Sequence, residues 1–490
     1  MKRLALFIVL FFGVALLACG CAKTADVTGK VENSFFPDKP AIEGVEVSAK
    51  GTKTTTDASG NYTIKIPAKP DSTATLSFSK ENYNIPDVVV TIDAQGAPQT
   101  PPSATAGLVL YNPEASYAVS ELTDLPSKGP RSGVFSPDGK YMYLIDDYLS
   151  TKQIIRLELD TNTSTILAES KDKSSFGAEI NPDWNKPCPG NDMILIEPTG
   201  VDISSDGDTL YFADKKERNI NGGIIRKITG VKNAKTAADV TITTIAGGGE
   251  YKLGNQLKYG EEYSGEKIDL GADIGGIELA DDDTLYACGT SRHSIFKITG
   301  IKDAKSVGDT KVHIFAGRSH GQKSLDGPIE KANFSTINDL EITPDGDSMY
   351  IADENTVRKL TGIKSIGKKQ DDKTPAPAIF TIAGDPKARG DAKELEDVNS
   401  ITLANDEDTI FVGNRLYPKR LRKITGVKAA LSAADTKISD VEGMDISEKG
   451  LENQDKVTFD IVYGCIINKE NTRLYLFEYT HKVPRVVGAK

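Results

Sequence analysis

A sixfold internal repeat covers most of this 490-residue chain and restricts the folds that it can adopt. In each copy, an apolar strand leads through an acidic turn into a second strand that carries an aromatic residue. The aromatic markers recur every 61 to 75 residues, at Tyr143, Tyr211, Tyr286, Tyr350, Phe411 and Tyr475. Self-similarity at a steady period is the signature of solenoids and propellers, in which each repeat is one supersecondary unit.

Each repeat continues beyond the aromatic strand. A third strand follows in most copies, as in IIRKITG at 224–230, and a fourth closes the unit, as in TTIAG at 243–247. The sixth copy stops after its third strand, whereas an unassigned strand, SYAVSEL at 116–122, precedes the first copy. We therefore predict a propeller of six four-stranded blades, in which the N-terminal strand completes the last blade and closes the ring.

The strings LYFAD at 210–214, IRKITG and TIAG, with Asp326-Gly327 ahead of the fourth copy, resemble the NHL repeat family of six-bladed propellers. Two features depart from that family: the period is longer, and Gly413-Asn414 replaces the usual Ala-Asp. Part of the extra length lies between the third and fourth strands, at 231–239, 301–309 and 427–435. We interpret these insertions as helical turns that decorate the rim.

The N-terminus has the pattern of an export signal. The basic residues Lys2 and Arg3 precede an apolar run from Leu4 to Ala18, which is too short to span a bilayer as a helix. The run ends in Leu-Leu-Ala-Cys, which resembles the bacterial lipobox and implies a signal peptide at 1–18, lipidation of Cys19 and a tether at 19–26. The alternatives are an ordinary signal peptide, an uncleaved anchor, or lipidation at Cys21. Lipidation would hold the protein on the membrane through its acyl chains alone.

Residues 27–112 form a second predicted domain. Short strands such as NYTIKIP at 61–67 alternate apolar and polar residues, as half-buried strands do, and a turn at 57–60 separates two of them. This segment resembles the carboxypeptidase regulatory-like (transthyretin-like) domain, which implies a spacer or adhesion module without an active site. The predicted fold is therefore all-β, a small β-sandwich followed by the propeller at 113–490.

Charge and composition exclude several classes of function. The formal net charge is −11, which disfavours nucleic-acid binding because phosphate neutralisation requires a basic face. The five cysteines form no CxxC pair, so neither a disulfide framework nor a zinc site of ordinary spacing is indicated. The four histidines are scattered, and no histidine triad can be assembled to hold a catalytic zinc as a lyase of the NHL family does.

A binding surface is expected on the face that carries the turns between strands two and three and the loops joining successive blades. These joining loops, such as 248–274 and 318–337, are longer than connection alone requires. The face mixes arginine with aromatic residues, which suits recognition of a protein or glycan, although a solvated rim without a partner is the alternative. The candidate residues are Tyr148, Arg218, Arg292, His293, Glu354, Arg415, Tyr417, Tyr479 and His481.

A second set of residues stands at the entries to the innermost strands. Related six-bladed propellers include lactonases whose channel mouth holds Ca²⁺ on Glu, Asn and Asp side chains, and similar hard oxygen donors occur here. The candidate metal ligands are Glu197, Asp273, Asn338, Asp339, Asp397 and Asn399. No other cofactor is expected.

The sequence thus favours an exported lipoprotein of the bacterial cell envelope, held on the outer membrane rather than the inner one, that binds a protein or glycan and performs no catalysis. A Ca²⁺-dependent propeller hydrolase or lactonase is the alternative.

Overall fold

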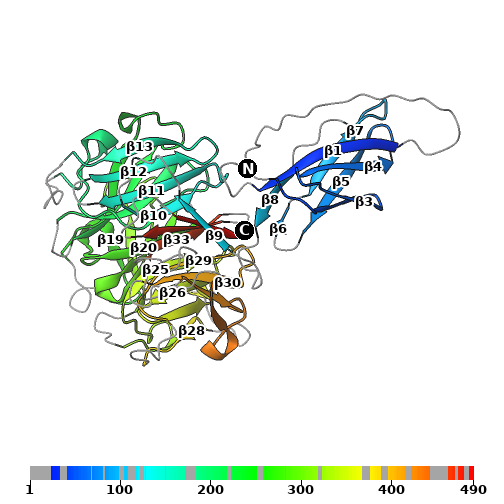
Figure 1. Cartoon of the computed structure of the whole chain (residues 1–490). Coiled ribbons are helices and arrows are strands. Elements are labelled where there is room, and N and C mark those ends of the chain that lie inside the picture. Colours follow the sequence, from blue (N-terminus) through cyan, green and yellow to red (C-terminus); the bar gives the residue numbers. More distant parts are fainter. Residues whose placement is uncertain are drawn as a thin grey trace, which may run out of the picture. The chain divides into compact units, whose positions relative to one another are not determined.

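The computed structural model is built almost entirely of β-strands (Figure 1). It describes residues 24–33, 41–67, 69–80, 83–85, 87–98, 104–108, 117–121, 126, 129–148, 151–171, 183–217, 222–250, 258–281, 283–317, 323–366, 376–387, 395–414, 421–441, 462–468, 473–478 and 485–489. In these segments the helices are three-residue 3₁₀ turns: η1 (Gly190–Asp192), η2 (Ala237–Asp239), η3 (Gly265–Lys267), η4 (Thr290–Arg292), η5 (Ile363–Ser365) and η7 (Ala433–Asp435). None of the helices in the described segments has the length and apolarity to cross a bilayer.

The chain divides into two compact units, the smaller built mainly from residues up to Ser120 and the larger mainly from Glu121 onward. The smaller unit contains two four-stranded sheets, ordered β4-β1-β8-β6 and β3-β2-β5-β7. Its strands are β1 (Thr24–Asn33), β2 (Glu46–Ala49), β3 (Thr52–Thr55), β4 (Asn61–Pro67), β5 (Ser72–Ser79), β6 (Tyr83–Asn84), β7 (Val88–Ile92) and β8 (Ala104–Leu108). One core joins the two sheets, and strict alternation along β4 buries Tyr62, Ile64 and Ile66.

Six antiparallel sheets make up the propeller in the described part of the chain. The first two are β10 (Pro130–Phe135), β11 (Tyr141–Tyr148), β12 (Thr151–Glu158), β13 (Thr163–Glu169), and β15 (Val201–Ile203), β16 (Thr209–Lys215), β17 (Gly223–Thr229), β18 (Thr241–Gly247), β14 (Cys188–Pro189). The next two are β20 (Ile274–Asp281), β21 (Thr284–Gly289), β22 (Ser294–Thr299), β23 (Lys311–Gly317), β19 (Glu262–Ser264), and β25 (Ile337–Ile342), β26 (Ser348–Asp353), β27 (Thr356–Thr361), β28 (Ala378–Gly384), β24 (Gly327–Pro328). The last two are β29 (Val398–Leu403), β30 (Thr409–Asn414), β31 (Leu421–Thr425), β32 (Lys437–Asp440), and β33 (Val462–Ile467), β34 (Leu474–Glu478), β35 (Arg485–Ala489), β9 (Tyr117–Glu121).

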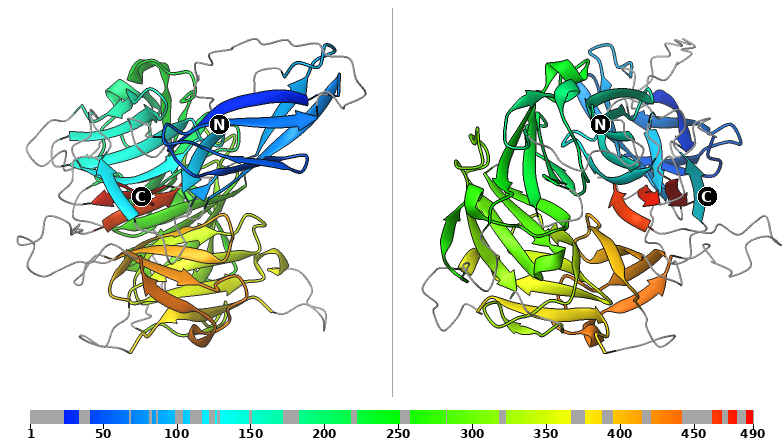
Figure 2. Two further views of the ribbon diagram at one scale, coloured as in Figure 1. Left: turned by 45° about the vertical axis from the view of Figure 1, so that its right-hand side comes forward. Right: turned by 90° about the vertical axis from the view of Figure 1, so that its left-hand side faces the viewer.

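The innermost strands of these sheets form a closed cycle. Each of β10, β15, β20, β25, β29 and β33 contacts the next, and β33 contacts β10. The green, yellow and orange sheets therefore stand around one axis (Figure 2). Apolar cores fill the spaces between neighbouring sheets; one, for example, joins Tyr143 and Leu167 of the first blade to Phe212 and Ile242 of the second. The predicted all-β propeller class is confirmed.

The last sheet is ordered β33-β34-β35-β9, so the strand predicted at 116–122 does complete it. The ring closes between the beginning and the end of the propeller sequence without a covalent link. Closure of this kind pairs the outer edge of β35, which would otherwise expose unpaired backbone groups.

The prediction of four strands per blade was incomplete for three blades. Short strands of the joining loops, β14, β19 and β24, pair with the outermost strands β18, β23 and β28. The joining loops also enter the core, since Leu270 and Phe334 are fully buried. A loop that covers a sheet edge and fills an apolar gap removes both from water, so part of the extra loop length is structural.

The insertions between strands three and four lock neighbouring blades together. Lys227 of the second blade donates to the carbonyls of Ile301 (3.1 Å) and Lys302 (2.7 Å) in the third. Lys359 of the fourth blade does the same to Val427 (3.2 Å) and Lys428 (2.6 Å) in the fifth. Of the insertions that we interpreted as rim decoration, those at 301–309 and 427–435 therefore accept hydrogen bonds from a lysine of the preceding blade, and the one at 231–239 accepts from Arg156 of the first blade. Their helical turns are the 3₁₀ turns η2 and η7, each with a capping box.

Replacing Lys359 with methionine is expected to lower the free energy of unfolding by about 1.5–3 kcal/mol, because two backbone carbonyls lose a charged donor. Lys297 is the matched control. It occupies the same place in the third blade, pairing with Tyr286 as Lys359 pairs with Tyr350, but no hydrogen bond of its ammonium group is seen in the described region. Thermal denaturation of both variants measures the difference. Equal losses would contradict the interblade lock.

Candidate functional site

A cavity of about 520 Å³ lies in the channel around which the innermost strands are arranged. All six innermost strands contribute to its wall. The polar and charged lining residues are Arg131, Ser132, Glu197, Thr199, Asp202, Asp214, Lys215, Asp273, Glu278, Thr290, Asn338, Asp339, Glu341, Asn399, Ser400, Thr402 and Tyr463. A hollow of this size lies within the usual range of small-molecule sites, and its wall is unusually polar for one.

Neutral polar side chains link blades two to six in succession at the N-terminal ends of the innermost strands, which we call the mouth. Thr199 Oγ1 donates to the Ile274 carbonyl (2.7 Å) and Thr290 Oγ1 to that of Ile337 (2.8 Å). The two asparagines do the same with their amide Nδ2 atoms: Asn338 reaches Val398 O (2.8 Å), and Asn399 reaches Tyr463 O (2.8 Å) and Val462 O (3.2 Å). These donors are therefore committed to the backbone, while the amide oxygens of the asparagines remain as acceptors.

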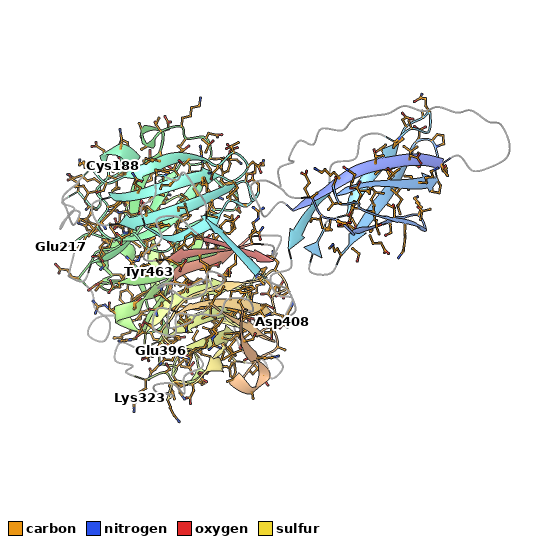
Figure 3. All side chains as sticks on the ribbon, viewed as in Figure 1. Cys188, Glu217, Lys323, Glu396, Asp408 and Tyr463 are labelled. Atoms are coloured by element: carbon orange, nitrogen blue, oxygen red, sulfur yellow. The ribbon has the colours of Figure 1, made fainter. Side chains whose placement is uncertain are left out.

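Two ionic clusters flank these links. Lys215, at the end of β16, lies 2.5 Å from a Glu197 oxygen and 2.8 Å from an Asp273 oxygen. This double pairing raises the pKa of the Lys215 ammonium, although burial opposes the shift. On the other side, Arg131 pairs with Asp147 (2.6 Å) and lies 5.2 Å above the ring of Tyr463, which Figure 3 labels on β33. An aromatic ring under a guanidinium is held by its quadrupole and presents a rigid apolar contact.

Four carboxyl groups line the cavity beyond the mouth. Asp202, Glu278 and Glu341 occupy the same position in three successive blades, because each pairs with the aromatic marker of the neighbouring strand, Tyr211, Tyr286 or Tyr350. The equivalent residues Val134 and Thr402 are uncharged. Asp339 stands two residues before Glu341. The acidic side chains therefore gather on the side of the channel formed by blades two to four.

Backbone amides of neighbouring strands hold these carboxylates in place. Asp202 accepts from Ile203 N and from Leu279 N of the next blade, both at 2.7 Å. Asp339 accepts from Leu340 N and from Ile401 N of the next blade, both at 3.0 Å. None of these carboxylates forms an ion pair with a described residue.

Removal from bulk water raises the pKa of all four groups. It raises the pKa of Asp202 to about 6 and that of Asp339 to about 7. The pKa of Glu278 rises well above its usual value because of burial and the nearby charges of Asp202 and Glu341. The pKa of Glu341 rises for the same reasons, with Asp339 as the main neighbour. Near neutral pH the cavity therefore retains protons, as expected when carboxyls crowd together without a cation.

These shifts predict a pH-dependent stability. Because the folded chain binds these protons more tightly than the unfolded chain, their contribution is complete below about pH 4 and is lost as the pH rises through 6 and 7. Replacing Glu278 and Glu341 together by glutamine should raise the thermal midpoint at pH 8 by about 2–4 °C, with little change at pH 4. Thermal scans against pH measure the effect. Glu262→Gln, at an exposed site, is the control, and a pH-independent shift would contradict the mechanism.

The structure brings together five of the six predicted metal ligands, Asp397 being the exception, as lining residues of the cavity. Lys215 lies between the carboxylates of Glu197 and Asp273, and both asparagines are tied to the backbone. Across the described segments, no group of three or more His, Cys, Asp or Glu side chains is placed to hold a metal ion. Asp397 has a left-handed backbone (φ 44°), and its amide donates to the side chain of Asn355.

Two of the predicted binding-face residues, His293 and Glu354, belong to one local network, and a third, Arg292, pairs elsewhere. His293 Nδ1 contacts the Ser335 carbonyl, and the Ser335 hydroxyl donates to Glu354 at 2.6 Å. Arg292 pairs with Asp269 and is mostly buried, so it serves the third blade rather than an exposed patch. For Tyr148 only the backbone is described, in β11. Arg218, Arg415, Tyr417, Tyr479 and His481, and the lipidation candidate Cys19, lie outside the described residues.

The sequence analysis missed Asp202, Glu278 and Glu341 as site residues. A signal was present, since each is an acidic residue between two aliphatic residues in an innermost strand, as in Val201-Asp202-Ile203. Alternation along a strand places such a residue opposite its apolar neighbours and thus toward the channel.

The aspartates that end the second strand of blades two and four bind the joining loop that precedes their blade. Asp214 and Asp353 do not cap the following turn. They accept from backbone amides of the joining loop, at 196–197 and 335–336 respectively.

No protein-family model matches the chain, and no curated protein matches it. Several solved structures are similar to it at low identity. An auxiliary nutrient binding protein from Bacteroides thetaiotaomicron VPI-5482 is 11% identical, with 91% of this chain and 90% of that chain covered and a TM-score of 0.46. A putative phosphatase from the same organism is 13% identical, with 91% of each chain covered and a TM-score of 0.46. The Cps50 (Swd1) β-propeller domain of Myceliophteria thermophila is 7% identical, with 76% of this chain and 100% of that chain covered and a TM-score of 0.40.

Proposed function

We propose that this chain is a non-catalytic binding protein whose propeller receives part of a protein or glycan partner at the mouth of its channel. The observation that carries the proposal is the 520 Å³ cavity, with polar side chains from all six blades converging on it. Convergent polar groups around a preformed hollow are the usual features of a binding site. The export-signal pattern and the lipobox-like Cys19 support a location on a membrane of the bacterial cell envelope, the outer membrane in our proposal. In this proposal the sandwich is a spacer and an NHL-type propeller is the binding domain.

The pairing of groups at the mouth supports binding over catalysis. Ca²⁺-dependent hydrolysis needs carboxylates at the mouth that are free to hold the metal and its bound water. Lys215 is instead shared by Glu197 and Asp273, and Arg131 is shared by Asp147 and Tyr463. Paired groups of this kind form a rigid surface for recognition. A Ca²⁺-dependent hydrolase or lactonase remains the alternative function, and it would need the Lys215 ammonium to leave the two carboxylates.

A pull-down with matched variants tests the proposal. Immobilised chain carrying Arg131→Ala and Tyr463→Ala should lose a partner that the unaltered chain captures from envelope extracts. Tyr141→Ala is the matched control, because Tyr141 underlies Arg156 in a similar pair (5.1 Å) that does not line the cavity. Capture that is unaffected by the mouth variant would place binding elsewhere. Calorimetric heat and a thermal shift with Ca²⁺ would support the hydrolase instead.

A further inference from the structure

We propose that the channel cavity binds a primary ammonium group, presented either by a free amine or by a lysine side chain of the partner. This inference rests on the proposed function, because it names the chemistry that the same cavity would accept. It follows from three features of the cavity: the supply of hydrogen-bond acceptors, the lack of a resident cation, and the spacing of the carboxyl groups.

The first feature is the neutral part of the mouth, which is independent of the carboxyl groups. The hydroxyl groups of Thr199 and Thr290 donate to backbone carbonyls of the next blade. The side-chain amides of Asn338 and Asn399 do the same. What these groups offer to a ligand is therefore oxygen lone pairs, apart from the second amide proton of Asn338. A ligand that enters must supply the donors, and an ammonium group brings three N–H donors and no acceptor.

The second feature is the uncompensated acidity beyond the mouth. Asp202, Glu278, Asp339 and Glu341 line the cavity, and no described lysine or arginine pairs with any of them. The cations nearest the mouth, Lys215 and Arg131, are already paired with carboxylates. A cation that enters the cavity would supply the charge that these groups lack, and the low-dielectric surroundings would strengthen that attraction.

The third feature discriminates between kinds of cation. Direct coordination of Ca²⁺ requires several oxygens at about 2.3–2.6 Å from one point. Asp202 and Asp339 are each fastened by amides of two blades, and the described residues hold no three acidic, histidine or cysteine side chains placed around a metal position. A cavity of about 520 Å³ with acceptors on separate blades instead suits an organic cation, whose alkyl stem occupies the volume between them.

Binding should release protons. The carboxyl groups hold protons in the empty cavity, and an entering R–NH₃⁺ favours their ionised form. The step is R–NH₃⁺ plus carboxylic acid giving the ammonium–carboxylate pair plus H⁺, which passes to solvent. Neither oxidation nor bond formation to carbon is involved. The other titratable or charged residues that line the cavity are Arg131, Glu197, Asp214, Lys215, Asp273, Tyr463 and Cys465. Burial raises the pKa of the Cys465 thiol to about 12, so this thiol keeps its proton near neutral pH.

Calorimetry on the full chain tests the inference with n-butylammonium as the probe and n-butanol as its neutral counterpart. We expect n-butylammonium to bind with net proton release, measured at pH 7 in two buffers of different ionisation enthalpy, and n-butanol to give no binding. Glu278→Gln combined with Glu341→Gln should weaken amine binding at least tenfold and abolish the proton release. Glu262→Gln should leave both unchanged, and circular dichroism shows whether each variant is folded.

A second arm separates the two sources of the ammonium group. A short peptide with one central lysine, compared with the same peptide carrying norleucine, should bind more tightly than n-butylammonium if a partner supplies the group, and less tightly if a free amine does. No binding of either ammonium probe, or equal binding by the glutamine variant, would overturn the inference. The proposed function would survive that result if partner capture still depended on Arg131 and Tyr463, and it would fail separately if capture did not.

Discussion

Replacing Arg358 with methionine should lower the free energy of unfolding of the propeller by about 3–5 kcal/mol, the cost of leaving a buried charge without its partner. The guanidinium is fully buried. It lies 3.0 Å from Asp353 and 2.8 Å from Asp326, and it donates to the carbonyls of Leu325 (2.7 Å) and Asn333 (2.6 Å). Methionine fills much of the volume but satisfies none of these acceptors, and Asp353 is itself fully buried.

The second blade supplies a matched comparison. Arg226 occupies the position of Arg358, since both pair with a threonine of the outer strand, and it contacts Asp214 at 3.1 Å. Pro187 occupies the position that Asp326 has in the fourth blade. The residues that follow them, Cys188 and Gly327, pair with the equivalent isoleucines Ile242 and Ile379 of the outer strands. In the second blade the guanidinium Nε and one terminal nitrogen are left without a hydrogen-bond partner.

Arg226→Met should therefore cost clearly less than Arg358→Met, because fewer acceptors lose a donor. Urea denaturation, monitored by tryptophan fluorescence, measures the loss of unfolding free energy in both variants. The one tryptophan of the chain, Trp184, belongs to the propeller and reports on its unfolding. Equal losses, or a loss below about 1 kcal/mol for Arg358→Met, would contradict the role assigned to its acceptors.

Deleting residues 113–123 should lower the thermal midpoint of the propeller by about 5 °C or more, because the last sheet loses its fourth strand. In the structure β9 pairs at the outer edge of the sheet β33-β34-β35. Without β9, no strand from the beginning of the propeller sequence pairs with the last sheet. β35 then becomes an edge strand with unpaired backbone groups. The loss should appear in the fluorescence of Trp184 as well as in calorimetry.

Addition of a synthetic peptide of residues 113–123 supplies the positive test. It should restore the midpoint of the deleted chain in a concentration-dependent manner, as expected for a strand that binds only the folded form. Deletion of 109–112, which shortens the connection and leaves β9 intact, is the control. An unchanged midpoint in the 113–123 deletion would show that the strand does not close the ring.

The stability of the ring and the chemistry of its channel were predictable to different degrees. The alternation of Tyr62, Ile64 and Ile66 and the sixfold series of aromatic markers follow local periodicity, and both predicted their strands correctly. Five of the six metal candidates line the cavity. Their pairing was not predictable, because Lys215 comes from the second strand of the blade and meets Glu197 and Asp273 from two joining loops.

The chain of amino acids alone determined that this protein is built of strands, how many copies of the unit it repeats, and which strand is left to close the ring, because these depend on periods of two and of some 60 to 75 residues along one dimension. Tertiary structure decided what the channel contains. Asp202, Glu278 and Glu341 lie more than 60 residues apart in succession and become neighbours only when the blades stand around one axis. Removal of bulk water raises the pKa of all three groups, and the charges of neighbouring carboxylates raise it further for Glu278 and Glu341. Neither cause is a property of any local segment.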